Sequence, residues 1–251
     1  MDGWVTLRTA AVSAALFDPM NGKAGVAAVR QNPPTREGSA VYLQLEPGAS
    51  MIVRLSDQPT QADRWSYWQN GAKATSLEGE WNVVFKQGGP ALPSSRKLTS
   101  LSSWTDFGGD AGAKFSGTAV YSLPFARPTG NSDAWRLDLG QIGDSGRIRL
   151  NGKEVAGLIQ PPWTVVIPAA ELKAENRLEV IVTNLAANRI ADMDRRGVKW
   201  KKFYNTNMPA RLRENMGPDK LFTAAHWSPR PSGLLGPVTL TPVQRFDPEK
   251  R

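Results

Sequence analysis

Short runs of alternating apolar and polar residues, each ending near a glycine or proline, dominate this sequence. The run AWRLDLG at 134–140 places three apolar side chains on one face and Arg136 and Asp138 on the other. Further on, Asn151-Gly152 separates two such runs, and this pair favours a type I′ hairpin. The 23 glycines and 19 prolines supply turns at short intervals. Together these features predict an all-β chain, a β-sandwich or jelly roll.

The runs divide the chain into three segments. Residues 1–56 contain three or four short strand-like runs, too few to be stable without a partner, and form a smaller N-terminal β segment. Residues 57–76 are polar with three aromatic residues that would be costly to leave in water, which predicts an aromatic linker packed against a neighbouring domain. Residues 77–251 form the main domain, with the jelly roll over 77–243.

The composition and the first residues exclude several classes of protein and site. An acidic residue follows Met1 and no basic segment precedes the apolar residues, so this N-terminus does not resemble a signal peptide. No run approaches the ~18 apolar residues of a membrane helix. The chain has no cysteine for thiolate chemistry and only one histidine, His226, too few for a histidine-rich zinc site. We expect no metal and no cofactor.

Positive charge is concentrated in residues 189–220. This segment holds nine cations and four anions. The difference, +5, is most of the chain's net charge of +8. It lies within residues 184–230, which have no clear strand pattern and predict a long loop. Such loops in compact domains are usually functional or disordered. The aromatic residues of the loop favour order: Trp200, Phe203, Tyr204 and Trp227.

Several chemistries fit this loop. Cations beside aromatic residues suit nucleic acid, but aspartates interrupt the patch and the remaining chain is nearly balanced in charge. The carboxylates Asp192, Asp194 and Glu214 would serve a small self-sufficient glycosidase as acid and base. The arginines that follow Asp194 favour salt-bridged aspartates instead, so we assign no catalytic residue. The aromatic residues suit either a sugar or a neighbouring domain.

The sugar interpretation predicts one concave carbohydrate-binding surface. Its members are Trp163, Asn184, Arg189, Asp192, Trp200 and Trp227. Sugars stack their apolar faces on indole rings, while amide, guanidinium and carboxylate groups bind the hydroxyls. Arg189 has two candidate roles, an ion pair with Asp192 that holds the loop or a donor to a sugar hydroxyl.

Five sequence blocks, in their order along the chain, resemble a known family. They are FSGTAVYSLPF, WRLDLG, IRLNGKEVAGLIQPPW, NRLEVIVTNLAANRIAD and RPSGLLGPVTL. The set resembles the galactose-binding-like jelly roll of large bacterial glycoside hydrolases, and is most similar to the C-terminal region of α-L-rhamnosidase-type enzymes. The resemblance covers about residues 77–243, and residues 1–56 look like the tail of a preceding β domain.

The resemblance implies a biological setting. In such enzymes a catalytic (β/α) barrel carries the acidic residues, and a barrel alone takes ~250 residues of alternating strands and helices, which this chain does not contain. The chain is therefore expected to be an accessory carbohydrate-associated module. Its implied partners are a glycan and the catalytic domain of an exported parent enzyme. The alternatives are the small self-sufficient glycosidase and an interdomain packing module without a ligand.

Overall fold

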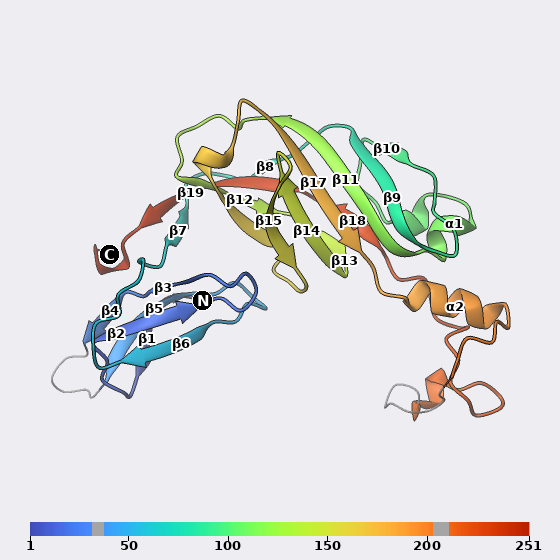
Figure 1. Ribbon diagram of the computed structural model, residues 1–251, viewed down its shortest axis with the longest axis horizontal. Coiled ribbons are helices and arrows are strands. Elements are labelled where there is room, and N and C mark those ends of the chain that lie inside the picture. Colours follow the sequence, from blue (N-terminus) through green and yellow to red (C-terminus); the bar gives the residue numbers. More distant parts are fainter. Residues whose placement is uncertain (32–37, 203–210, 251) are drawn as a thin grey trace.

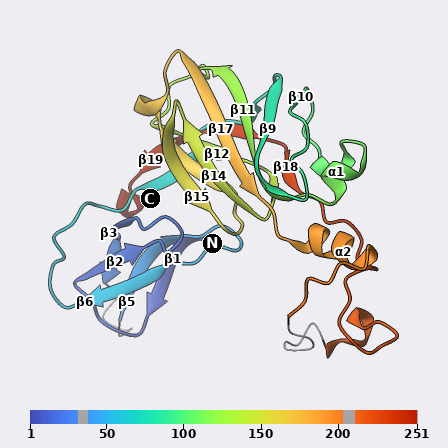
Figure 2. The same cartoon turned by 45° about the vertical axis from the view of Figure 1, so that its right-hand side comes forward.

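A computed structural model describes residues 1–31, 38–202 and 211–250 (Figure 1). The strands of an N-terminal lobe, residues 1–56, lie at one end of a larger β-sandwich. From the other end of the sandwich projects the segment 185–230, here called the excursion, whose described residues 185–202 and 211–230 are mostly non-β (Figures 1 and 2). The all-β class predicted from the sequence is confirmed. The galactose-binding-like jelly-roll subtype stays a prediction.

The N-terminal lobe packs two three-stranded antiparallel sheets around a small core. The first has the order β1 (Asp2–Leu7), β5 (Ser39–Gln44), β4 (Val29–Gln31), and the second β3 (Ala24–Val26), β2 (Ser13–Phe17), β6 (Ile52–Ser56). The core joins buried Leu16 of β2 to buried Val41 of β5, with Trp65 from the following segment packed against them. With so few large buried side chains, the lobe is still expected to need its contacts with the sandwich to fold.

The sandwich consists of two antiparallel sheets and a short ribbon. The larger sheet has the order β10 (Arg96–Leu98), β9 (Trp81–Gly89), β11 (Ser116–Ala126), β17 (Glu175–Thr183), β14 (Ser145–Leu150), β15 (Lys153–Leu158). The smaller has the order β16 (Thr164–Pro168), β12 (Ala134–Asp138), β19 (Thr239–Phe246), β7 (Tyr67–Asn70), with β8 (Thr75–Ser76) also paired to β19. The ribbon pairs β13 (Gln141–Gly143) with β18 (Gly233–Gly236).

The alternating runs bury their apolar faces between these sheets. Trp135 and Leu137 on β12 are buried together with Leu178 and Val180 on β17, as their period of two predicts. The expected Asn-Gly hairpin is present between β14 and β15: Asn151 has a φ of 53° and the glycine after it a φ of 85°. Both angles are positive, as a type I′ turn requires.

The helices among the described residues are short, and all but the last lie between strands. They are η1 (Trp104–Asp106), α1 (Asp110–Ala113), η2 (Ala169–Glu171), α2 (Ala187–Arg195), η3 (Arg213–Asn215) and η4 (Pro248–Lys250). Among the residues that the structure describes, no helix has the length and apolar character needed to cross a membrane.

Residues 57–76, predicted as a linker, also contribute strands to the sandwich. β7 and β8 both lie in this segment and pair with β19. Tyr67 at the start of β7 is 4% exposed, and its hydroxyl accepts from Ala28 N at 3.0 Å and donates to Tyr42 O at 3.1 Å in the lobe. The rings of Tyr42, Tyr67 and Phe246 pack at centroid distances of 5.2, 5.9 and 6.1 Å. This segment therefore ties the lobe to the sandwich.

We expect Tyr67→Phe to weaken that connection. The substitution keeps the ring but leaves Ala28 N and Tyr42 O without the partner they have in the folded protein, which costs about 1–3 kcal/mol of unfolding free energy. Urea unfolding followed by tryptophan fluorescence measures the difference. Equal unfolding free energies for the two proteins would show that the hydroxyl contributes nothing to the junction.

Candidate functional site

The excursion begins with a helix that the sequence pattern did not predict. Residues 184–230 were expected to be a loop, whereas 187–195 form α2. Ala186 at the N-cap makes no side-chain hydrogen bond, so the usual polar start signal is missing from the sequence. A stop signal is present: Gly197 has a φ of 66° and donates to Asp194 O, a common way for a helix to end.

Two buried asparagines fasten the excursion to the sandwich. Asn184 donates to Phe115 O at 3.0 Å and accepts from Gly117 N at 2.8 Å, which ties the end of β17 to the start of β11. Asn188 on α2 donates to Arg230 O at 2.9 Å and accepts from Arg230 N at 2.8 Å. The first bond pair anchors the entry to the excursion, and the second joins its entry to its exit.

Asp194 is the polar centre of the excursion. Its carboxylate accepts from Trp200 Nε1 at 2.8 Å, Lys201 Nζ at 2.9 Å and Ala224 N at 2.8 Å. The side chains of Asp194 and Lys201 are only 4% and 14% exposed. Burial works to raise the pKa of Asp194, but the donors from Ala224, Lys201 and Trp200 outweigh it and hold the pKa below its usual value. A general acid of a glycosidase needs the opposite shift.

A second group of contacts closes the far part of the excursion. Trp227 Nε1 donates to Asn215 Oδ1 at 2.9 Å, and the Trp227 ring meets Phe222 edge-on at 5.8 Å. Arg195 donates to the backbone oxygen of Trp227, and Lys201 donates to that of Phe222 at 2.8 Å. The described part of the excursion is thus held mainly by polar contacts between its own residues.

Arg189 does not form the ion pair with Asp192 that was one of its two predicted roles. Asp192 Oδ2 accepts instead from Arg196, at 3.0 Å from Nε and 2.7 Å from Nη2, one helical turn later. The Arg189 guanidinium lies against Gly89 at the end of β9, where the missing side chain leaves room for it. Its Nη1 is buried and has no hydrogen-bond partner among the described residues.

The six residues of the predicted carbohydrate surface have different surroundings. Trp163 packs against the core of the sandwich, and its backbone oxygen accepts from Leu139 N at 3.0 Å. Asn184 is 8% exposed and engaged with the backbone. Trp200 and Trp227 lie within the excursion with their indole nitrogens bonded to side chains. The carbohydrate surface stays a prediction, and with Asp192 bound to Arg196, four of its six side chains have structural partners.

The remaining candidates add no catalytic pair. Glu214 of η3 is exposed, while Asp192 and Asp194 are paired with cations. Phe203 and Tyr204 lie outside the described residues. No cluster of three or more possible metal ligands occurs in the described ranges.

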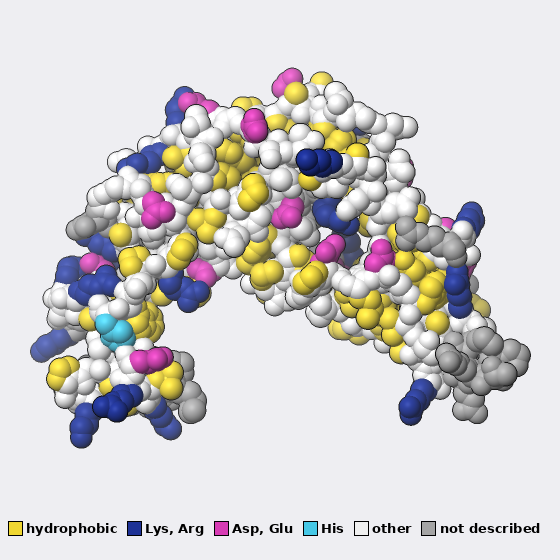
Figure 3. Space-filling view, turned by 180° about the vertical axis from the view of Figure 1, so that it is seen from behind, with side chains coloured by type: hydrophobic (Ala, Val, Ile, Leu, Met, Phe, Trp, Pro, Cys, Tyr) yellow, Lys and Arg dark blue, Asp and Glu magenta, His cyan; other side chains and the backbone are white. Residues whose placement is uncertain are grey.

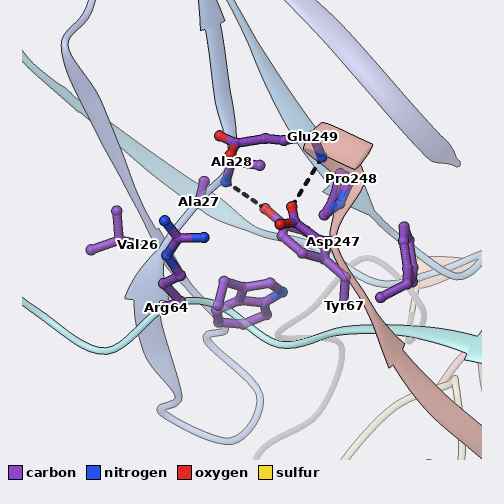
Figure 4. A pocket seen from close by; sticks show the side chains of 10 residues that line it. Val26, Ala27, Ala28, Arg64, Tyr67, Asp247, Pro248 and Glu249 are labelled. Atoms are coloured by element: carbon purple, nitrogen blue, oxygen red, sulfur yellow. Dashed lines mark hydrogen bonds between the residues drawn. The ribbon is translucent and has the colours of Figure 1, made fainter. Parts of the chain in front are cut away.

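A cavity that the sequence did not reveal lies at the junction of lobe and sandwich. It has a volume of about 230 Å³ and is lined by residues 26–28, 64, 65, 67 and 246–249 (Figure 4). No sequence signal marks it, because its walls come from three segments far apart in the chain.

Comparisons with known proteins connect this architecture to sugar-cleaving enzymes. A protein of Formosa agariphila described as a putative beta-glucuronidase is 31% identical over 184 residues, which are 65% of this chain and 15% of that protein. The structure of a rhamnosidase from Novosphingobium sp. PP1Y matches with a TM-score of 0.69 and 26% identity, over 97% of this chain and 22% of that chain. No family model matches.

The chain is related to glycoside hydrolases. It spans less than a quarter of the length of either relative, 15% of one and 22% of the other. The predicted resemblance to glycoside hydrolases is therefore confirmed at this level. Its placement in the C-terminal jelly roll of a rhamnosidase-type enzyme stays a prediction.

We expect Asp194→Ala to loosen the excursion while leaving the sandwich folded. The change removes the counter-ion of the poorly exposed Lys201 and strands two further donors, a loss of about 3–5 kcal/mol for a buried pair. Native-state hydrogen exchange of amides 221–227 measures the local stability. Asp192→Ala on the same helix is the matched control, because Arg196 is 52% exposed and such a pair contributes about 0–1 kcal/mol. Equal protection in the two variants would contradict the central role of Asp194.

The same contact should respond to acid. Because the folded protein lowers the pKa of Asp194, its contribution to stability is present above the unfolded pKa of about 3.9 and is lost as the pH falls through the folded pKa. The indole N–H signal of Trp200 reports this hydrogen bond in an NMR titration. We expect it to shift below about pH 4, before signals from the sandwich core change. A Trp200 signal that follows the core signals would argue against local release.

Proposed function

We propose that this chain is an accessory β-module of a glycoside hydrolase, without a catalytic centre of its own, that packs against the catalytic domain of a longer enzyme. The observation that carries this proposal is the state of the excursion's carboxylates. Asp192 and Asp194 are both held by cations, and the pKa of Asp194 is shifted away from acid catalysis. The small self-sufficient glycosidase is therefore less well supported than a module.

The shape of the molecule suits such packing. The lobe and the excursion extend from opposite ends of the sandwich on the same side, and the space-filling view shows a hollow between them (Figures 1 and 3). The lobe is tied down by Tyr67 and the excursion by Asn184 and Asn188. Two fixed projections around a hollow offer a preformed surface for a partner domain.

The excursion also has the surface chemistry of a contact region. Leu185, Val198, Leu212 and Leu221 are between 37% and 54% exposed, and all four lie in it. Single exposed apolar residues are ordinary, but a concentration in one projecting segment is typical of an interaction site. Figure 3 shows cations and apolar side chains together over this part of the molecule.

The charge of the excursion indicates the character of the partner surface. Residues 185–230 contain ten cations and four anions, which gives a net charge of +6. An acidic surface would meet this charge favourably, and a catalytic domain with acidic residues around a sugar site is such a surface. The same proposal has two further parts. The parent enzyme is α-L-rhamnosidase-like and exported, and the module contacts a glycan at Trp163, Arg189 and their neighbours.

The first test is turnover by residues 1–251 alone. We expect no hydrolysis of 4-nitrophenyl α-L-rhamnopyranoside or 4-nitrophenyl β-D-glucuronide at enzyme-like rates, on the order of 1 s⁻¹ or faster. If the chain hydrolyses a substrate at such a rate, and Glu214→Gln abolishes the hydrolysis, the glycosidase alternative is established. Glu214 suits this test because it is exposed and holds no structural contact with a described cation.

The second test compares residues 1–251 with the full product of the gene that encodes them. Hydrogen exchange at amides 211–222 is expected to slow in the longer protein, whereas amides 147–157 on the β14–β15 hairpin serve as the internal control. A double variant, Leu212→Asp with Leu221→Asp, should cancel the slowing because it places charge on the apolar contact. If the gene product consists of residues 1–251 alone, or if the excursion exchanges at the same rate in both proteins, the proposed packing against a catalytic domain is contradicted.

A further inference from the structure

The cavity at the junction of lobe and sandwich has fixed walls. Val26 N donates to Asp63 O and Trp65 N donates to Val26 O, both at 2.8 Å, so the lobe and the following segment are joined along one wall. On the other side, Arg30 Nη2 donates to Pro248 O at 3.0 Å and holds the C-terminal tail against the lobe. The cavity of about 230 Å³ is therefore an open pocket bordered by three segments that bond to one another.

Opposite charges face this cavity without meeting. Figure 4 shows the Arg64 guanidinium, the Asp247 side chain across from it beside Tyr67, and the Glu249 side chain reaching over Ala28. Arg64 forms no ion pair within 4 Å in the part of the chain that is described. The Asp247 carboxylate accepts from Glu249 N at 3.0 Å and lies 4.0 Å from Lys250 Nζ, with its side chain 32% exposed. Donor and acceptor groups are thus left available to a ligand.

Aromatic side chains complete the lining. Trp65 packs against the core of the lobe and also lines the cavity, so its indole is supported from behind. The Tyr67 hydroxyl is already engaged with Ala28 and Tyr42, so Tyr67 offers its ring rather than a donor.

We propose that this cavity is a binding subsite for a single neutral sugar residue. Sugar hydroxyls both donate and accept, so they match a guanidinium on one wall and carboxylates on the other, while the apolar ring face stacks on an indole. The carboxylates of Asp247 and Glu249 are balanced by Arg64 and by Lys250, whose Nζ lies 4.0 Å from Asp247, so the cavity has no strong net charge to attract a uronate or a phosphate. The volume lies below the ~300 Å³ of pockets for larger ligands, which favours one sugar unit over a longer segment of glycan.

The experiment is saturation-transfer NMR on the intact 251-residue chain. Methyl α-L-rhamnopyranoside is the neutral probe and methyl β-D-glucuronide the anionic one. Binding of the neutral probe is expected in the millimolar range, as suits a few hydrogen bonds and one stacked ring. Arg64→Ala and Glu249→Gln should each weaken it by roughly tenfold or more, the effect of losing a hydrogen bond to a charged group. Arg8→Ala, an exposed arginine of the same lobe outside the cavity, is the matched control.

Each other result would overturn the proposal. No saturation transfer at tens of millimolar means the cavity does not bind a sugar. Binding that survives Arg64→Ala and Glu249→Gln unchanged lies elsewhere on the chain. Stronger binding of the glucuronide, or displacement of the neutral probe by glycine, would show that the charges select an anion or a zwitterion. The subsite does not depend on the docking role, because its residues lie outside the excursion.

Discussion

β19 is the strand on which the arrangement of the molecule depends. It pairs with β12 on one side and with β7 and β8 on the other, so it joins the interior of the sandwich to the segment that leads from the lobe. Its last residue, Phe246, packs between Tyr42 of the lobe and Tyr67 of β7. Removing this strand would separate the lobe from the sandwich and dismantle the cavity between them, because residues 246–249 form one of its walls.

The two projections from the sandwich are held by different physical means. The lobe is attached by ring packing and a buried hydroxyl with two backbone partners, which are insensitive to pH in the neutral range. The excursion is attached and organised by amide and carboxylate groups, with Asp194 accepting from three donors. A segment that buries little apolar surface and depends on a charged centre is the natural place for local opening in such a fold.

The relationship to glycoside hydrolases gives these differences a context. The matching regions are a small share of much longer proteins, 15% and 22%. The proposed accessory role would use the sandwich and its two projections to position a neighbouring domain, and a cationic, partly apolar excursion would suit an acidic neighbour. The cavity at the lobe, for which we propose a sugar ligand, lies outside the excursion and has charged side chains of both signs in its lining.

The all-β class, the faces of β12 and β17 and the Asn151-Gly152 hairpin could be predicted from the amino-acid sequence, because alternation and turn chemistry are local properties. The sequence also located the cationic segment and the relationship to glycoside hydrolases. Three contacts required the folded arrangement: Asp192 pairs with Arg196 rather than Arg189, Asp194 accepts from Ala224 thirty residues away, and Arg64 lines the same cavity as the C-terminal tail. Those contacts join residues that are distant in the chain or that compete within one helix. Which contacts form depends on how the sheets bring the segments together, and no local sequence pattern encodes that arrangement.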